Sequence, residues 1–294
     1  MKKVLLVPSF IIILLSGCKS QMIREDLLAC SRLTDGYWQI ATVDASGKNV
    51  RLVTATLVDK RHPVWLEDGK KIMYRTNNSE LYVLDLATNG DQRVLDKFGQ
   101  ISDPDWSPAV QRFAFTRFSP NLADESDIWT IRLDGSDQRL LTNAPGMQYH
   151  PAITLDGRKI AFVSGKGFDA HTIWLMDIDG QNQKPLTEAK KGYDLFPGWS
   201  PDGHRIAFTS DRTGNLDIWI MDADGQNQTQ LTEYEGLDTY PTWSSDGKCI
   251  FFVSNRTGQL QIWQVNCMSR QKKQITFGAH ENNDPACLQM RKNE

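Results

Sequence analysis

Histidine, aspartate and aromatic residues stand immediately before a recurring proline, and they are the side chains best placed to do chemistry in this chain. They are His62, Asp103, His150, Phe196, Tyr240 and Asp284, and Asp194 and Asp238 lie three residues before two of the prolines. If these imidazole and carboxylate groups converge at the mouth of one channel, they could bind a cation, a basic peptide or a sugar. The same residue types also cap strand ends and solvate a channel, so both interpretations stay open.

Other catalytic motifs find no support in the sequence. There is no G-x-S-x-G elbow for a serine nucleophile, and "HENND" at His280 lacks the second histidine of a zinc-binding H-E-x-x-H helix. No glycine-rich phosphate loop precedes a helix. We therefore assign no catalytic residue, metal ligand or cofactor, and whether the protein is an enzyme is left open.

The charge of the chain argues against a nucleic-acid partner. The 294 residues carry a formal net charge of -3, and no basic run or basic aromatic stripe is present. A nucleic-acid-binding protein would show a clustered positive surface.

The proline positions belong to an internal repeat of about 44 residues. Successive copies read "HPVWLEDGKKIMY", "DPDWSPAVQRFAF", "HPAITLDGRKIAF", "FPGWSPDGHRIAF" and "YPTWSSDGKCIFF", and a truncated copy begins at Pro285. Each unit alternates apolar runs with Asp-Gly turns, which is typical of four short antiparallel strands. The Asp-Gly pairs are expected to serve the turns, and the repeated tryptophans are expected to pack between sheets.

The repeat predicts an all-β fold, a six-bladed β-propeller of four-stranded antiparallel blades. A single four-stranded sheet with two apolar faces cannot bury both faces alone, whereas radial stacking buries them against neighbours. Residues 27–54 align with the second to fourth strands of a unit, and the C-terminal "PACLQM" supplies the missing first strand. Both termini are therefore expected to close the last blade, within a propeller domain spanning residues 27–294.

The pattern "WSPDG…IAF.S.R.G…DIW.MDADG…LT" resembles the repeat of TolB-type propellers across residues 27–294. The resemblance implies a non-catalytic binding module that docks an envelope protein or peptide on the mouth face, as a monomer. Similar repeats occur in glycan-degrading propellers, so the alternative is a glycan-fragment lyase or hydrolase that uses His62 or His150 as general base. A structural scaffold without a specific ligand is a third interpretation.

The N-terminal residues have the features of an export signal. Lys2 and Lys3 precede a short apolar stretch, which ends in "LSGC" at Cys18. This ending resembles the lipobox of bacterial lipoproteins, which implies a signal peptide over 1–17, lipidation of Cys18 and a tether over 18–26. Lys19 then implies attachment to the outer membrane, facing the periplasm. An ordinary secretory signal is the alternative.

Four further cysteines and a set of arginines allow more than one interpretation. Cys249 with Cys267, and Cys30 with Cys287, are candidate disulfides on neighbouring strands, and four buried thiols are the alternative. An arginine also recurs after the second strand of most units. We expect each to pair with an aspartate nearby, although a ring of arginines could instead bind a carboxylate. These arginines are Arg32, Arg75, Arg117, Arg212 and Arg256.

Overall fold

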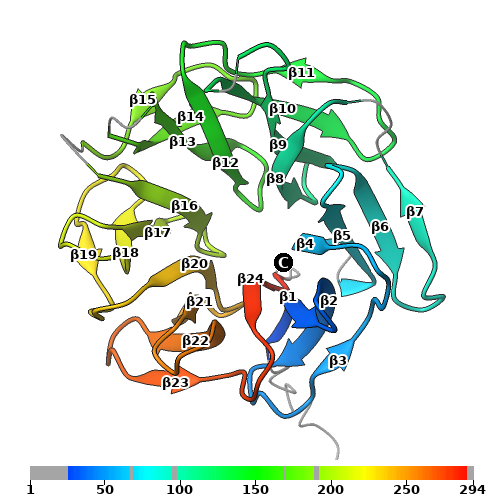
Figure 1. Ribbon diagram of the computed structural model, residues 1–294. Coiled ribbons are helices and arrows are strands. Elements are labelled where there is room, and N and C mark those ends of the chain that lie inside the picture. The colour runs from blue at the N-terminus through cyan, green and yellow to red at the C-terminus, as the bar shows by residue number, and fades with distance from the viewer. Residues whose placement is uncertain are drawn as a thin grey trace, which may run out of the picture.

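The sheets of the protein are arranged around a central axis (Figure 1). The structure is a computed structural model that describes residues 26–66, 69–94, 98–122, 124–167, 170–188 and 192–289. The elements of this part of the chain are strands, and the innermost strand of each repeat faces the axis. The expected all-β propeller architecture is confirmed.

Four of the sheets contain four strands each. One has the order β24 (Asn282–Cys287), β1 (Leu27–Thr34), β2 (Tyr37–Asp44) and β3 (Arg51–Leu52). The next contains β4 (Lys60–Leu66), β5 (Lys71–Thr76), β6 (Leu81–Asp85) and β7 (Asp91–Arg93). Another contains β16 (Asp194–Trp199), β17 (Arg205–Ser210), β18 (Asp217–Asp222) and β19 (Thr229–Gln230). The last contains β20 (Asp238–Trp243), β21 (Cys249–Ser254), β22 (Gln261–Asn266) and β23 (Lys272–Gln274).

The remaining sheet has eight strands. Its first half contains β8 (Ile101–Ser107), β9 (Arg112–Phe118), β10 (Ser126–Arg132) and β11 (Arg139–Leu140). Its second half contains β12 (Met147–Ile153), β13 (Lys159–Gly165), β14 (Thr172–Asp177) and β15 (Lys184–Pro185).

The prediction of six separate four-stranded blades is wrong, because the strands pair into four four-stranded sheets and one eight-stranded sheet. The eight strands are continuous because β10 pairs in parallel with β12 through Ser126 and Met147. The Ser126 hydroxyl strengthens this junction by donating to the Gln148 carbonyl at 3.1 Å. The repeat pattern contains no signal for this pairing, since the serine belongs to the divergent "FSPNLADES" region.

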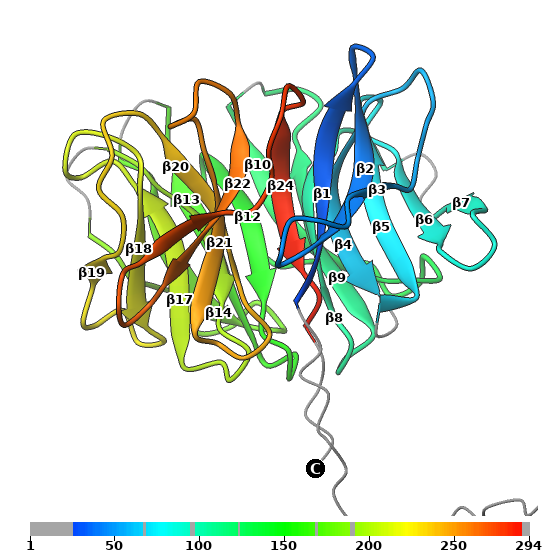
Figure 2. The ribbon, with the colours of Figure 1, turned by 90° about the horizontal axis from the view of Figure 1, so that it is seen from below.

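The chain segments at the two ends of the described region lie side by side. Strand β24 pairs antiparallel with β1, where Leu28 faces Cys287 and Ala29 faces Ala286. Figure 2 shows β1 and β24 adjacent in the wall of the ring. The sheet that contains the first strand therefore takes its innermost strand from the end of the chain.

Apolar side chains fill the spaces between neighbouring sheets. One cluster joins Ile173 and Leu175 of β14 to Ile206 and Phe208 of β17, and these four side chains are buried. Ala207, between Ile206 and Phe208, packs into the cluster on the other side of the sheet, because successive side chains of a strand point to opposite faces. Each sheet thus depends on its neighbours to exclude water from both faces.

Tryptophans of the inner strands also donate hydrogen bonds from their indole N–H groups to backbone carbonyls of neighbouring sheets. Trp65 donates to the Ala286 carbonyl, Trp199 to Ala152 and Trp243 to Gly198, each at 3.0 Å. The corresponding indole N–H of Trp106 is buried without a partner. The tryptophans expected to pack between sheets therefore add a directional bond at three of four positions.

Neither predicted disulfide is formed, and all four described cysteines are free thiols. Cys249 faces Asn266 across the β21–β22 hairpin, so the register is one residue away from the one that would oppose Cys249 and Cys267. Cys287 faces Leu28, so Cys30 lies two residues further along β1. Burial raises the pKa of the Cys30 thiol to about 12.

Candidate functional site

Each inner strand carries a β-bulge at its X-Pro dipeptide. The pairing register shifts across this dipeptide in all six inner strands. The residue before each proline has a left-handed backbone, with φ between 48° and 52°. Such values are uncommon in non-glycine residues and cost about 1–3 kcal/mol each. The six residues are His62, Asp103, His150, Phe196, Tyr240 and Asp284, and we call them the bulge ring.

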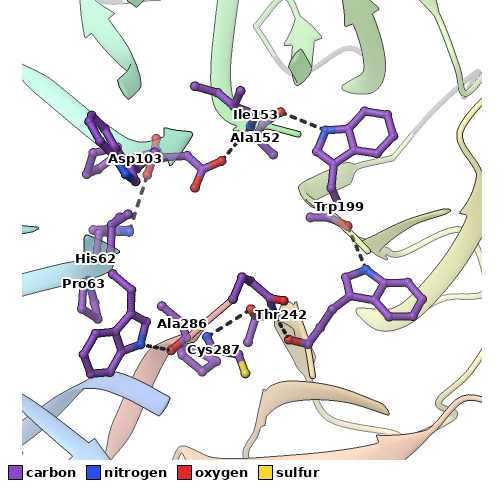
Figure 3. Close-up of a pocket in the computed structure, with 18 of the residues that line it drawn as sticks. His62, Pro63, Asp103, Ala152, Ile153, Trp199, Thr242, Ala286 and Cys287 are labelled. Atoms are coloured by element: carbon purple, nitrogen blue, oxygen red, sulfur yellow. Dashed lines mark hydrogen bonds and ion pairs between the residues drawn. The ribbon is translucent and has the colours of Figure 1, made fainter. Parts of the chain in front are cut away.

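The bulge ring lines a central cavity of about 270 Å³. The wall continues through the six prolines and the residues that follow them, and it includes Pro108, Leu155 and Pro201 in the turns after the inner strands. The residues of the bulge ring lie within the inner strands themselves. Figure 3 shows residues on all sides of this cavity, with His62 and Asp103 on one side and Trp199 and Thr242 on the other.

Six of the eight residues that the sequence analysis singled out beside the prolines line the cavity, and two do not. His62, Asp103, His150, Tyr240 and Asp284 are brought together, and Phe196 joins them. Asp194 and Asp238 lie at the starts of β16 and β20, outside the cavity lining.

Asp194 and Asp238 are instead buried carboxylates that form ion pairs with less buried arginines. The two oxygens of Asp238 accept from the Arg256 guanidinium at 2.8 and 2.6 Å, and Asp194 accepts in the same way from Arg212. Arg256 also lies over the Trp263 ring, 4.8 Å from its centroid. The expected pairing of arginine with a nearby aspartate is therefore confirmed for these two.

One side of the bulge ring contains a carboxylate between two imidazoles. Asp103 Oδ1 lies 3.8 Å from His62 Nδ1, and Asp103 Oδ2 lies 3.7 Å from His150 Nε2 (Figure 3 labels His62 and Asp103). Burial opposes the charge of Asp103, but His150, His62 and the Ser102 hydroxyl lower its pKa overall. Asp103 is therefore a carboxylate at neutral pH.

His150 is neutral at neutral pH. Burial lowers its pKa to about 4, against the opposing attraction of Asp103. Its Nδ1 atom is buried without a hydrogen-bond partner. The imidazole therefore presents an uncharged ring to the cavity.

From His150 onward the bulge ring is aromatic. The ring centroids of His150 and Phe196 are 4.1 Å apart, and those of Phe196 and Tyr240 are 3.9 Å apart. The Tyr240 and His62 rings follow at 6.4 Å. Burial raises the pKa of Tyr240 above its usual range, so its hydroxyl stays protonated.

Asp284 is held by polar contacts on one carboxylate oxygen alone. Its Oδ2 atom accepts from the Ser31 hydroxyl at 2.8 Å and from the His62 backbone N–H at 3.5 Å. Its Oδ1 atom is buried and has no partner. One acceptor of this carboxylate is therefore unused among the residues that the structure describes.

Asp105 is a cavity residue that the sequence analysis missed. It lies two residues after Asp103, at the position occupied by Val64, Ala152 and other uncharged residues in the remaining copies. Asp105 Oδ2 accepts from the Ile153 backbone N–H at 2.7 Å, and burial raises the pKa of Asp105 to about 6. Alignment of the residue after each repeat proline would have exposed this lone carboxylate.

No group of three or more His, Cys, Asp or Glu side chains within the described ranges is arranged to hold a metal ion. Along the same ranges, no helix has the length and hydropathy needed to cross a bilayer. The expected signal peptide, the lipidation site Cys18 and the tether up to residue 25 lie outside the described residues.

Comparison with known proteins defines the class. The TolB beta propeller domain model matches residues 29–187 and 166–293, so the chain belongs to the TolB-type β-propeller family, as the resemblance implied. The chain is 35% identical over 188 residues to an uncharacterized protein of Agrobacterium fabrum. It is 31% identical over 130 residues to the Tol-Pal system protein TolB of Anaeromyxobacter dehalogenans. These matches cover 59% and 42% of this chain but 62% and 28% of the relatives.

Solved structures show the same fold. TolB from Acinetobacter baumannii aligns with a TM-score of 0.78 and 21% identity, over 90% of this chain and 67% of that one. An oligogalacturonate lyase in complex with manganese aligns with a TM-score of 0.62 and 16% identity, over 85% of this chain and 73% of that one. At these identities the likeness concerns the fold alone.

Proposed function

We propose that this chain is a non-catalytic binding module that docks an envelope protein or peptide in the cavity of the bulge ring. The observation that carries the proposal is a preformed cavity whose lining residues are held in costly left-handed conformations. Such conformations persist where the surrounding structure fixes them, and they cluster at ligand-binding sites. Membership of the TolB-type family supports a binding role.

We further propose that the protein is held in the bacterial envelope by lipid on Cys18, at the outer membrane and facing the periplasm. The Asp26 carboxylate accepts from the Ser245 N–H at 2.9 Å, in the turn that follows β20. This turn lies at the end of the inner strands, toward which the cavity extends. A chain of about eight residues spans at most about 26 Å. The tether would therefore turn the cavity toward the membrane, where a membrane-bound partner is within reach.

The binding proposal is tested by reversible crosslinking in intact cells, followed by capture and mass spectrometry. The wild-type chain is compared with Thr242→Trp, which fills the cavity, and with Thr213→Trp in an exposed hairpin tip. We expect Thr242→Trp to abolish one adduct that the wild type and Thr213→Trp both form. If every adduct survives Thr242→Trp, the cavity is not the docking site.

A glycan-processing enzyme is the second candidate, and the contacts of Asp103 with His62 and His150 favour it. An imidazole oriented by a carboxylate is a common general base. Incubation with oligogalacturonate should show no turnover if the protein only binds. If turnover occurs and is lost in His62→Ala with His150→Ala while partner capture persists, the non-catalytic proposal fails.

A further inference from the structure

The cavity has an excess of negative charge. Three carboxylates line it, those of Asp103, Asp105 and Asp284, and among the described residues that line it none is lysine or arginine. Two arginines lie near the ring without lining the cavity. Arg75 acts electrostatically on Asp103, while the guanidinium of Arg61 lies over the Trp38 ring, 4.0 Å from its centroid. A cation that entered the cavity would therefore meet carboxylates with no basic side chain between them.

The unpartnered Oδ1 atom of Asp284 is a second, independent sign of a ligand. Buried carboxylate oxygens are normally hydrogen-bonded, because an unused acceptor costs about 1–3 kcal/mol. Asp284 is only 6% exposed and lines the cavity. A donor bound in the cavity would lie beside this carboxylate.

Aromatic faces complete the site. Phe196, Tyr240 and the neutral His150 form a tilted series of rings, which adjoins Asp103 at His150. The electron-rich face of an aromatic ring attracts an ammonium or guanidinium group within about 6 Å of its centroid. An inorganic cation would gain little from these rings, whereas a planar guanidinium can stack on one ring and bond a carboxylate.

The protein already uses this combination to hold its own arginines. Arg256 bonds both oxygens of Asp238 and lies 4.8 to 5.6 Å from the centroids of three aromatic rings. Arg212 is held in the same way between Asp194 and two aromatic rings. In the bulge ring, carboxylates and aromatic faces are present, and no side-chain cation from the described part of the chain lines the cavity.

We propose that the bulge ring binds one organic cation, the arginine or lysine side chain of the docked peptide. The inference rests on the proposed function and specifies the chemistry of its ligand. Asp284 and Asp103 would accept from the cation, and Phe196 and Tyr240 would cover its face. A cavity of about 270 Å³ lies near the lower limit of ligand pockets, so it suits a side chain rather than a folded domain.

The test uses Nα-acetyl-arginine amide and its neutral isostere Nα-acetyl-citrulline amide as probes, with the full chain at pH 7.5 and low salt. Calorimetric titration should show at least ten-fold tighter binding of the arginine probe. We expect Asp284→Asn to weaken that binding about ten-fold and Phe196→Leu about five-fold. Asp224→Asn is the matched control in an exposed turn and should leave it unchanged.

Several outcomes would overturn the inference. The first is that the two probes bind equally tightly. The second is that calcium chloride displaces the arginine probe from the wild type while Phe196→Leu binds this probe as tightly as the wild type does. Because Asp284→Asn removes a buried contact, its fold is checked by circular dichroism, and Phe196→Leu tests the site independently. If Thr242→Trp abolishes the crosslinked adduct while Asp284→Asn and Phe196→Leu leave it intact, the cation inference fails and the proposed function stands.

Discussion

At the scale of single residues, one position of the repeat contributes a side chain to the cavity in each of its six copies, and these side chains form the bulge ring. The bulge lies at each X-Pro dipeptide, and the residue before the proline adopts a left-handed conformation and lines the central cavity. This backbone geometry occurs in all six inner strands, so the chemistry of the cavity depends on which six side chains occupy these positions. In this chain they divide into carboxylate and imidazole on one side and aromatic rings on the other.

The raised pKa of Asp105 predicts a pH-dependent effect of Asp105→Asn on stability. The folded state binds this proton up to about pH 6, whereas a free carboxyl loses it near pH 4, so this group costs stability as pH rises through that window. Asp105→Asn removes the cost and retains an acceptor for the Ile153 N–H. We expect its Tm to exceed the wild-type Tm by about 2–5 °C at pH 7.5, with a smaller difference at pH 4.5. Calorimetric Tm differences that are equal at both pH values would contradict this.

The ion pair of Asp238 and Arg256 predicts a large loss of stability in Asp238→Ala. Asp238 is fully buried, and its removal leaves the guanidinium without its carboxylate partner, which costs about 3–5 kcal/mol of unfolding free energy. Asp224→Ala in an exposed turn should cost less than about 1 kcal/mol. Urea denaturation measures both, and Asp238→Ala combined with Arg256→Leu should cost less than Asp238→Ala alone. If the double variant loses as much unfolding free energy as Asp238→Ala and Arg256→Leu lose together, charge pairing is not the cause.

At the scale of elements, the inner strands determine how neighbouring sheets are joined. Their tryptophans cross to the next sheet, and the link is a hydrogen bond where a carbonyl lies within reach. At β8 the indole of Trp106 has no acceptor. The same residue type thus makes a bond in some repeats and only packs in another.

This difference predicts unequal effects of Trp65→Phe and Trp106→Phe. The two side chains are 8% and 7% exposed, so truncation removes similar buried area from each. Trp65→Phe also removes the hydrogen bond to the Ala286 carbonyl, and we expect it to cost about 1 kcal/mol more than Trp106→Phe. Chemical denaturation measures the difference, and equal costs would mean that the indole bond adds nothing to the contact between β4 and β24.

The sequence predicted these elements well and their register less well. Alternation and Asp-Gly turns located the strands, and the repeated proline located the residues of the bulge ring. The Cys249–Cys267 prediction failed because a one-residue change of register moves a side chain out of alignment with its partner. The separate-blade prediction failed because one serine in a divergent loop pairs β10 with β12. Local patterns carry no information on such contacts between repeats.

At the scale of the whole molecule, the cavity exists because inner strands from both ends of the chain meet around one axis (Figure 1). Strand β24 supplies Asp284 and Ala286 to the cavity wall, Gln289 follows this strand in the wall, and β1 holds the strand in place. Asp103 and His150 come from the middle of the chain. The site is therefore a property of the assembled ring, and no single repeat contains it.

The most direct measurement of the central claim is site-specific photocrosslinking in intact cells. A photoreactive benzoylphenylalanine is placed at Leu155 or Gln289, both in the cavity wall, and for comparison at Leu140 or Leu52, which are exposed on the outer strands β11 and β3. The account predicts that the two cavity positions form the same discrete adduct with one envelope protein or peptide and that the two outer positions do not. The same adduct from the outer positions, with none from the cavity, would contradict it.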